Sequence, residues 1–426
     1  MDNNLIQRHQ QVYAPVINWD SEVEIVSALG TWVTDTEGKR YLDFASGISV
    51  INAGHNHPAV LAAARDQLER LWHAGGAYRY SSLVTAAEKI VAVAPPSIER
   101  LFFMNSGAEA VEASLKLARR VTGRQGIFVF RGGFHGRTMG SVSYTTSNAK
   151  YRHGYHPLLP SVFVAPFPHP YRWGMSEEEA TEHALRELDL MLKHDIHPDE
   201  VAAFLLEPVQ GEGGYYPAPV PFLRRLRELA DQHGILLVLD EIQTGFGRTG
   251  KWFASEHYGI EPDVLALGKA IANGLPLSAV GARARLHDAW PTGAHGTTFG
   301  GNPVACAAAA ANVDALAGMI PGVPALGAHA FARFAELKGR HATIGDVRGL
   351  GLMVGVELVQ PGGNTPDPQA FPFLARYARE HGLFLIDCGP DANVIRFVPP
   401  LCVTVAELDM GIDIIDRGLA EYEKRG

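Results

Sequence analysis

Hydrophobic and polar positions follow two different patterns between about residues 57 and 315. Short apolar runs occur in the segments RLFFMN, GIFVFRG, AAFLLEP and ILLVLDE. Between them, segments such as AEAVEASLKLARR and PFLRRLRELADQHG repeat apolar residues with the helical period, and Gly234 ends the second segment as a helix C-cap. Strands that alternate with helices in this way predict an α/β fold with a mostly parallel sheet and helices on both of its faces.

The two ends of the chain show other patterns. Residues 30–44 contain two short β-rich runs around TEGK, which predict a hairpin. Beyond residue 315 the pattern passes through a helix, the segment TIGDVRGLGLMVGVELV, a helix around Arg376 and the strand-like NVIRFV. We therefore predict a large domain over residues 57–315 and a smaller α+β domain built from residues 1–56 and 316–426.

Composition narrows the class of protein. The chain has 426 residues, 46% of them hydrophobic, and a net charge of −9 with scattered Lys and Arg residues, so we expect small-molecule partners and no nucleic acid. The N-terminus MDNNLIQRHQQ is polar, and no stretch approaches the roughly 20 apolar residues of a spanning helix, so we expect neither secretion nor a membrane. The histidine spacings match no ligand set, and we predict no metal site. The three cysteines, at positions Cys306, Cys388 and Cys402, lie far apart and form no CxxC pair. This pattern favours a protein of the reducing cytoplasm.

Charged residues stand directly after three of the predicted strands. Glu207 ends AAFLLEP, Asp240 and Glu241 end ILLVLDE, and Lys269 follows VLALG. Because ligands bind at the carboxyl ends of the strands in an open parallel sheet, these side chains should share a crevice. Each residue alone is most often an ordinary loop or surface residue. A desolvated lysine near another cation, however, has a lowered pKa and can attack a carbonyl group.

Two glycine-flanked turns offer places for a phosphate. The segment MNSGAEA leads into a helix whose first turn contains Ser106, Gly107 and Ala108, and such a turn presents free N–H groups. An ordinary N-cap explains this segment equally well. Thr297 and Thr298 before FGGNP form the second turn.

The segment TGFGRTGKW is a misleading match to two phosphate-binding patterns. Gly245, Gly247 and Gly250 have GxGxxG spacing, and Lys251 completes much of a P-loop. Trp252 stands where a P-loop has Ser or Thr, and the glycines do not lie in a tight turn between a strand and a strong helix. We therefore interpret the segment as a flexible loop near the active site.

Five separated motifs together form a family pattern. SGAEAVEASLKLAR, FHGRT, EPVQGEGG, LDEIQTGFGRTGKWFASEHYGIEPDVLALGKAIANGLPLSAV and TTFGGNPVACAA resemble class III (ω-) aminotransferases, in the order in which that family has them. The resemblance covers most of the chain and implies an enzyme of fold type I that uses pyridoxal 5'-phosphate. It also implies a homodimer, or a dimer of dimers, whose active sites are shared between subunits.

The resemblance assigns roles to cofactor-binding residues. Lys269 resembles the lysine that binds the cofactor as a Schiff base and moves the substrate proton, and Asp240 resembles the partner of the pyridinium nitrogen. Gly107 and Ala108 would hold the phosphate through backbone N–H groups, with Thr298 contributed by the neighbouring subunit. The predicted cofactor-binding residues are Ser106, Gly107, Ala108, Phe134, His135, Asp240, Ile242, Gln243, Lys269 and Thr298.

Three of these residues surround the cofactor ring. Phe134 resembles the aromatic residue that stacks on the ring, and Gln243 resembles the residue that approaches its phenolic oxygen. We interpret His135 as a hydrogen-bonding or pocket-wall residue.

The predicted substrate side consists of two arginines, a switch and two further residues. Arg137 of HGRT resembles the arginine that receives the distal carboxylate, and Arg396 resembles the one that receives the α-carboxylate, since guanidinium groups bind carboxylates bidentately. Glu212 resembles the family's switch, which pairs with the arginine when an ω-amine is bound and releases it for an α-keto acid. Ile48 resembles an apolar residue of the pocket, and Glu207 either orients a neighbouring group or is structural.

The segment CGPDANVIRFVPPL is more similar to 4-aminobutyrate aminotransferases than to the acetylornithine branch. We therefore expect amino transfer from an ω-amino acid such as 4-aminobutyrate to an α-keto acid such as 2-oxoglutarate, by a ping-pong mechanism. Ala108 is a departure, because Ser is expected there in the closest 4-aminobutyrate enzymes. An ornithine or acetylornithine aminotransferase, a racemase or epimerase of the same fold, and a binding protein that has lost the reaction are alternatives.

Overall fold

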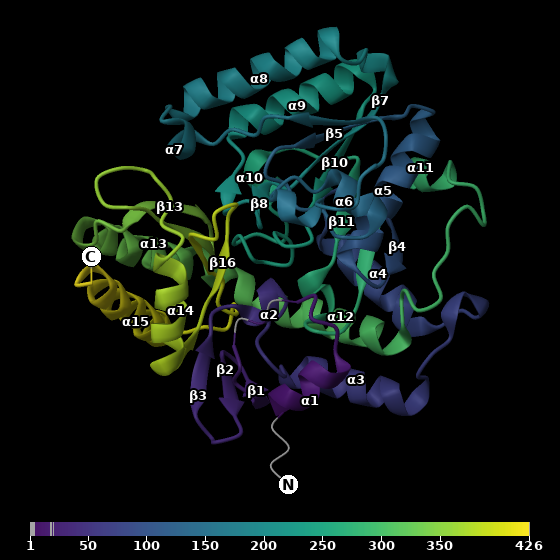
Figure 1. Cartoon of the computed structure of the whole chain (residues 1–426). Coiled ribbons are helices and arrows are strands. Elements are labelled where there is room, and N and C mark those ends of the chain that lie inside the picture. Colours follow the sequence, from purple (N-terminus) through teal and green to yellow (C-terminus); the bar gives the residue numbers. More distant parts are fainter. Residues whose placement is uncertain (1–4, 18, 20, 426) are drawn as a thin grey trace.

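A seven-stranded sheet forms the centre of the protein, whose computed structural model describes residues 5–17, 19 and 21–425 (Figure 1). Six strands are parallel to one another, and only β12 runs antiparallel to both of its neighbours, β4 and β11. The prediction of a mostly parallel sheet is confirmed. In spatial order the strands are β4 (Arg100–Met104), β12 (Ser278–Ala282), β11 (Val264–Leu267), β10 (Leu236–Asp240), β7 (Val201–Leu206), β5 (Gly126–Phe130) and β6 (Val162–Ala165).

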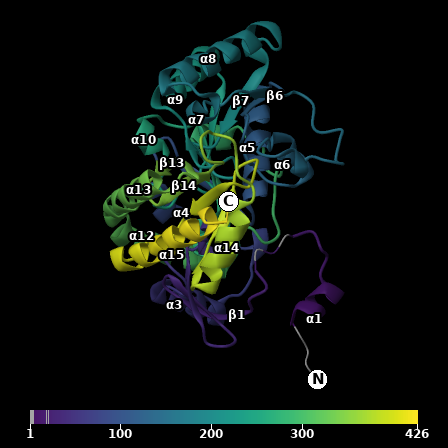
Figure 2. The ribbon, with the colours of Figure 1, turned by 60° about the vertical axis from the view of Figure 1, so that its left-hand side comes forward.

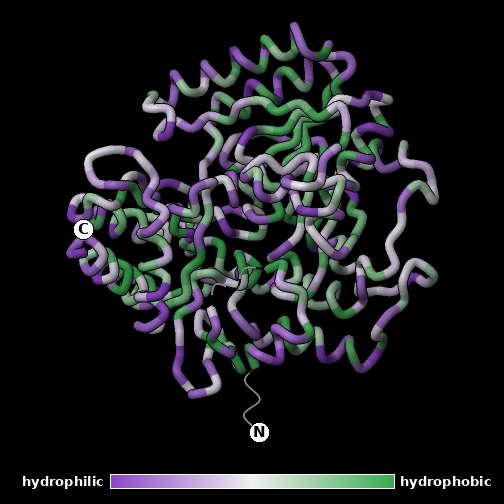
Figure 3. The backbone as a smooth tube through the Cα atoms, in the orientation of Figure 1, coloured by the Kyte–Doolittle hydropathy of each residue, from purple (hydrophilic) through white to green (hydrophobic). Residues whose placement is uncertain are grey.

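Both faces of this sheet are buried, which explains why its strands read as continuous apolar runs. Along β5, Ile127 and Val129 join a core with helix α5 (Gly107–Thr122). Phe128 and Phe130 point the other way and join a second core with helices α8 (Glu177–His194) and α9 (Val220–His233). Figure 3 shows these strands as the most hydrophobic part of the upper half of the molecule.

The N-terminal and C-terminal segments build two smaller sheets. The first has the order β1 (Ile25–Leu29), β2 (Trp32–Asp35), β3 (Arg40–Asp43) and β15 (Leu383–Phe384), so a strand from the far end of the chain completes it. The predicted hairpin is confirmed as β2 and β3, whereas β1 was not predicted. The second sheet is antiparallel, with the order β13 (Ile344–Leu350), β14 (Met353–Leu358), β17 (Val394–Phe397) and β16 (Ile386–Cys388). The boundaries at residues 56 and 315 stay predictions.

The remaining elements surround these sheets. Gly234 caps α9 with φ +65°, and the helix around Arg376 forms as α14, as predicted. The other helices are α1 (Leu5–Val12), α2 (Ser46–Ser49), α3 (Pro58–Arg70), α4 (Ser81–Val93), α6 (Met139–Tyr144), α7 (Pro170–Trp173), α10 (Ser255–Tyr258), α11 (Ala284–Asp288), α12 (Pro303–Met319), α13 (Val323–Arg340), α14 (Ala370–Glu380) and α15 (Val405–Glu423). Short elements are β8 (Val209–Gln210), β9 (Tyr216–Pro217) and the 3₁₀ helices η1 (Gly75–Ala77), η2 (Ala149–Tyr151), η3 (Pro198–Glu200), η4 (Lys269–Ala272) and η5 (Ile320–Gly322).

Two helical regions differ in how deeply they are packed. Helix α1 has no buried residue and lies at the periphery (Figure 2). By contrast, Pro303–Arg340 passes a length and composition test for a membrane-crossing helix, although the sequence pattern was judged to contain no such stretch. Its α12 part packs against α3 and α4, and 56% of its most apolar window is buried inside the protein. A helix of a protein core meets the same test.

Candidate active site

The carboxyl ends of three neighbouring parallel strands bring charged residues together. Asp240 is the last residue of β10, Glu207 follows β7, and Lys269 follows β11 after one glycine. The charges of both carboxylates act on the amine of Lys269, so the three side chains lie near one another at this edge of the sheet. Glu241 does not belong to this group. Its buried carboxylate instead accepts hydrogen bonds from the Thr244 hydroxyl and from backbone N–H groups of the next loop.

The amine of Lys269 lies in an environment that disfavours its charge. Burial lowers the pKa of Lys269, and the positive charge of Arg396 lowers it further, while the nearby carboxylates oppose this shift. The backbone of Lys269 has φ +45°, a left-handed conformation that is uncommon outside glycine and that concentrates at functional sites. A lysine held this way keeps a larger neutral, nucleophilic fraction than an exposed one.

Asp240 and His135 form a buried pair. The distance from His135 Nδ1 to Asp240 Oδ2 is 2.8 Å, and the two residues are 2% and 3% exposed. The other carboxylate oxygen accepts from the backbone N–H of Ile242 at 3.1 Å. Because a carboxylate only accepts, Nδ1 of His135 carries the proton in this pair. His135 is thus the hydrogen-bonding residue that we predicted, and it fixes the orientation of Asp240.

Glu207 joins two loops of the site. Its carboxylate accepts from the backbone N–H groups of Phe134 at 2.8 Å and Gly211 at 2.9 Å. Burial raises the pKa of Glu207 above its usual range. With both oxygens occupied by the backbone, this geometry favours the orienting role over direct contact with a substrate.

The start of helix α5 has the geometry that a phosphate requires. Ser106 is the N-cap, and its hydroxyl and backbone N–H form a capping box with Glu109. The hydroxyl is therefore engaged in the cap, whereas the N–H groups of Gly107 and Ala108 have no intrahelical partner. A Cβ atom at Gly107 would lie 2.9 Å from the end of the Ile242 side chain, which would have to shift, so a glycine leaves the most room there.

Gln243 is held by two hydroxyl groups. Its Oε1 accepts from Tyr215 at 2.8 Å and from Ser49 at 3.4 Å, which leaves the amide Nε2 as the group available to a ligand. Ser49 belongs to a turn, Ser46–Ser49, in which all four residues have φ between +48° and +65°. Three of the four residues are not glycine, and L-residues are unfavourable in this left-handed conformation. The turn therefore stores strain. It presents Ile48, which is 54% exposed, next to the residue that holds Gln243.

An ion pair occupies the predicted α-carboxylate position. Arg396 Nη2 contacts Glu212 Oε2 at 2.5 Å, and the Tyr151 hydroxyl donates to Glu212 Oε1 at 2.7 Å. Although burial opposes it, Arg396 and Tyr151 lower the pKa of Glu212, so this carboxylate stays charged. The exposed Arg137 lies nearby, with its guanidinium carbon 5.9 Å from the Phe134 ring centre and 5.7 Å from that of Tyr151. Glu212 thus pairs with Arg396, and its role as a switch stays a prediction.

Thr298 is exposed and is not part of the buried cluster. It lies on the loop before α12 and lines a cavity of about 500 Å³ with Asn105, Glu109 and Phe299. Its predicted contact with a phosphate of a second subunit stays a prediction.

The segment TGFGRTGKW is not a loose loop. Arg248 is fully buried and donates to the backbone oxygens of Leu352 and Pro399 and to the side chain of Asn52. Burial lowers the pKa of Arg248 to about 10. The segment lies beside the site, but its interpretation as a flexible loop is wrong, because it links the large sheet to the C-terminal segment.

Two side chains that contact predicted site residues were not predicted from the sequence. Tyr151 bonds to Glu212 from a region without regular periodicity, 61 positions earlier in the chain. Tyr215 directly follows the EPVQGEGG motif, and this adjacency is the only signal that pointed to it. Hydroxyl groups that act on other side chains leave no spacing pattern.

The site fits the pyridoxal phosphate implied by the resemblance. Helix α5 offers unpaired N–H groups for a phosphate, and a Cβ at Gly107 or Gly268 would collide with or crowd Ile242 in this cradle. Asp240 offers a fixed, buried carboxylate, and Lys269 offers an amine with a lowered pKa. The donor set therefore matches a cofactor that carries a phosphate, a basic ring nitrogen and a carbonyl group.

Comparison with known proteins agrees with this geometry. The family model for class III aminotransferases matches residues 16–419. The chain is 39% identical to the 5-aminovalerate aminotransferase DavT of Pseudomonas putida and 37% identical to the 4-aminobutyrate aminotransferase GabT of Escherichia coli, in both cases over 99% of each chain. An amine transaminase structure from an uncultivated Pseudomonas species, with PLP bound, has a TM-score of 0.90 and 32% identity over 96% of this chain and 98% of that one. The chain belongs to the class III aminotransferases, enzymes of fold type I that depend on pyridoxal 5'-phosphate.

Proposed function

We propose that this enzyme transfers the amino group of an ω-amino acid, 4-aminobutyrate or a close homologue, to an α-keto acid such as 2-oxoglutarate. The two substrates use one pocket in turn, in a ping-pong sequence. The observation that carries this proposal is the pair of Glu212 and Arg396 next to Lys269, with Arg137 at the rim. Such a pair can neutralise the inner arginine for one substrate and expose it for the other.

The buried residues serve the cofactor. Pyridoxal phosphate supplies an electron sink for the bond that breaks at the substrate carbon. Lys269 would hold the cofactor covalently and, when released, could carry the proton of the substrate carbon. Asp240 would keep the ring nitrogen protonated, and His135 holds Asp240 in place. Gln243, Phe134 and the start of helix α5 would hold the phenolic oxygen, the ring and the phosphate.

The outer residues select the substrate. An ω-amino acid with a distal carboxylate would place that group on Arg137, while Glu212 keeps Arg396 neutralised. An α-keto acid has a carboxylate next to the reacting carbon, and Glu212 must leave Arg396 to admit it. Ile48 would form an apolar wall of this pocket. Planar guanidinium groups suit both carboxylates, because each can accept two parallel N–H bonds.

Two observations support an ω-amino acid as the donor. The named relatives DavT and GabT act on 5-aminovalerate and 4-aminobutyrate by their names, and we extend that substrate class to this chain. In addition, the CGP turn between β16 and β17 contacts the switch, because the N–H of Gly389 donates to the backbone oxygen of Glu212 at 2.9 Å. The turn that resembles 4-aminobutyrate enzymes thus positions the residue that distinguishes the two substrates.

The proposal includes a homodimer in the cytoplasm, with active sites shared between subunits. The exposed apolar residues Trp72, Leu275 and Phe299 surround a cavity of about 310 Å³ close to Thr298. Exposed apolar patches of this kind mark protein interfaces. A second copy that covers this patch would bring Thr298 to the phosphate of the neighbouring site, and residues 57–315 would form the large domain on which the dimer is built.

The proposal is tested by single-turnover titration of the holoenzyme without keto acid. We expect 4-aminobutyrate or 5-aminovalerate to convert the cofactor from its aldehyde form to its amine form, and 2-oxoglutarate to restore it. Conversion by ornithine or N-acetylornithine alone would contradict the proposed donor. A cofactor that never changes form while an amino acid loses optical activity would make the enzyme a racemase.

A further inference from the structure

We propose that Tyr151 is a positioning residue of the Glu212 switch: its hydroxyl holds the Glu212 carboxylate on Arg396 and so sets how readily the site accepts an α-carboxylate. This inference rests on the proposed function, because it concerns the exchange between ω-amines and α-keto acids. Tyr151 would be a third residue of the switch, for which the sequence indicated only Glu212 and Arg396.

The contacts of Tyr151 place it between the two carboxylate-binding residues. Its hydroxyl donates to Glu212 Oε1 at 2.7 Å, while Glu212 Oε2 contacts Arg396 at 2.5 Å. Its ring meets the Phe134 ring edge to face, with centres 5.4 Å apart, and the Arg137 guanidinium lies 5.7 Å from its centre. One side chain therefore touches the switch, the residue expected to stack on the ring and the expected receptor of the distal carboxylate.

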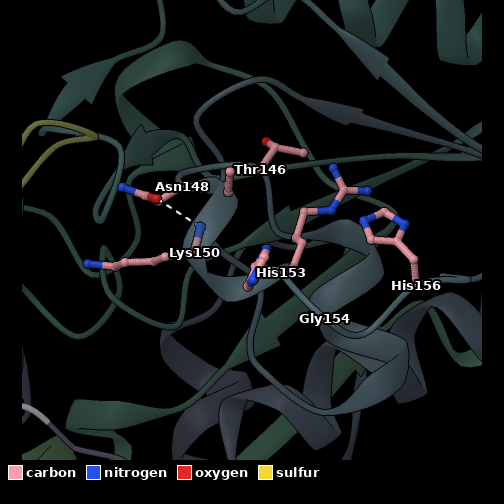
Figure 4. A pocket seen from close by; sticks show the side chains of 8 residues that line it. Thr146, Asn148, Lys150, His153, Gly154 and His156 are labelled. Atoms are coloured by element: carbon pink, nitrogen blue, oxygen red, sulfur yellow. Dashed lines mark hydrogen bonds between the residues drawn. The ribbon is translucent and has the colours of Figure 1, made fainter.

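The backbone of Tyr151 is fixed relative to the switch. The short helix η2 is capped by Asn148, whose side chain accepts from the backbone N–H of Lys150 (Figure 4). The same side chain donates to the backbone oxygen of Pro390. The preceding residue, Gly389, donates to the backbone oxygen of Glu212. The segments that carry Tyr151 and Glu212 are thus both hydrogen-bonded to the same turn, so structure outside the pocket helps to set their distance.

The hydroxyl of Tyr151 acts as a permanent donor. Burial raises the pKa of Tyr151, and the negative charge of Glu212 raises it further, so the hydroxyl keeps its proton. Its bond to a carboxylate belongs to the stronger, charge-assisted class. When Glu212 swings away to free Arg396, this bond and the ion pair must both break.

Removal of the hydroxyl should make the open arrangement more populated. A ligand that binds only the open arrangement then gains apparent affinity by the same factor. We expect Tyr151→Phe to lower the ratio of kcat/KM for 4-aminobutyrate to that for L-glutamate about tenfold, the size typical of one hydrogen bond to a charged group. Most of the change should come from better use of L-glutamate. Tyr155→Phe is the matched control, because Tyr155 is 57% exposed and lies outside the described site.

A binding measurement separates this inference from the proposed function. Glutarate, a dicarboxylate of the same length as 2-oxoglutarate, should bind the Tyr151→Phe holoenzyme about tenfold more tightly by calorimetry. In a Glu212→Ala background, Tyr151→Phe should change glutarate affinity no further, because the hydroxyl acts through the side chain of Glu212. Unchanged glutarate affinity in Tyr151→Phe, or equal losses for both amino donors, would overturn the inference. If the wild-type enzyme ignores 4-aminobutyrate, the proposed donor is wrong, and the glutarate experiment still decides the role of Tyr151.

Discussion

The floor and the rim of the active site are built in different ways. The floor consists of side chains at the ends of the central strands, and its members His135, Asp240 and Gln243 are at most 8% exposed. Each of them has a hydrogen-bond partner within the same chain. At the rim, Ile48 is 54% exposed, and Arg137 and Thr298 are also exposed on loops.

This difference shows which part of the chemistry a single chain completes. Buried groups with fixed partners are preorganised, so they need no rearrangement when charge develops during the reaction. The rim residues are exposed, and in the proposed dimer a second copy of the chain would cover some of them. The pair of Glu212 and Arg396 lies between them, with the arginine side chain 5% exposed and the glutamate side chain 25% exposed.

Lys269→Ala removes the centre of the floor and should have the largest effect. We expect turnover to fall by about 10⁴-fold or more, the upper range of general acid–base catalysis, because the covalent attachment is lost in addition. Stopped-flow single-turnover kinetics with 4-aminobutyrate measures this loss. Lys251→Ala, at an exposed lysine of the TGFGRTGKW segment, serves as the control and should keep normal rates. Normal turnover in Lys269→Ala would refute the central role of this residue.

Asp240→Asn tests whether Asp240 supports the reaction through its negative charge or only through the shape of its side chain. Asn can still accept the hydrogen bond from His135, but it cannot hold a proton on the ring nitrogen. We expect the half-reaction to slow by about 10²- to 10³-fold, comparable to the loss of one preorganised electrostatic contact.

The adjacent acid provides the control for Asp240. Glu241 accepts from Thr244, Ala254 and Ser255 and faces away from the crevice. Glu241→Gln should lower the free energy of unfolding by about 1–3 kcal/mol, because an amide would face N–H donors, and leave the half-reaction rate nearly unchanged. If Glu241→Gln slows the half-reaction as much as Asp240→Asn does, the rate does not depend specifically on the charge of Asp240.

The sequence predicted the floor better than the rim. The strands of the central sheet are buried on both faces, so their apolar runs stand out, and the residues after them share one edge by topology. The missed strand β12 (Ser278–Ala282) contains Ser, Gly and small apolar residues, and its antiparallel direction depends on pairing with strands far away in the chain. Strand β1 is also exposed along most of its length, so no apolar pattern marks it.

The remaining differences come from contacts between distant side chains. The glycine-rich segment around Arg248 resembles a loop in composition, yet a buried guanidinium binds it to residues about 100 and 150 positions later. The Tyr151 and Tyr215 hydroxyls act on side chains whose positions only the fold determines. Hydrophobic and turn patterns in a sequence indicate which segments are buried and where the chain turns. They do not indicate which distant side chains form hydrogen bonds.

Arg137→Lys probes the rim and should have a smaller, selective effect. A point charge replaces a planar fork, so the distal carboxylate loses a bidentate contact. We expect kcat/KM to fall about 30-fold for 4-aminobutyrate and much less for a simple α-amino acid, in line with a hydrogen bond between charged groups. Arg131→Lys, at another exposed arginine before the HGRT motif, is the control. Equal losses for both donors would mean that Arg137 does not contact the distal carboxylate.

Tyr215→Phe tests the boundary between floor and rim, and we expect the smallest effect. The change removes one of two hydroxyl donors to Gln243 Oε1, and Ser49 remains to hold the amide. A net loss of about 1 kcal/mol corresponds to a roughly fivefold slower half-reaction. The pH at which the bound cofactor changes its absorbance should move upward, because a less well oriented Gln243 stabilises the anionic phenolic oxygen less. Tyr216→Phe is the matched control, since the neighbouring hydroxyl donates to Glu357 at 3.0 Å and should affect stability alone. If the cofactor spectrum shifts equally in both variants, Tyr215 acts through packing and not through its hydrogen bond to Gln243.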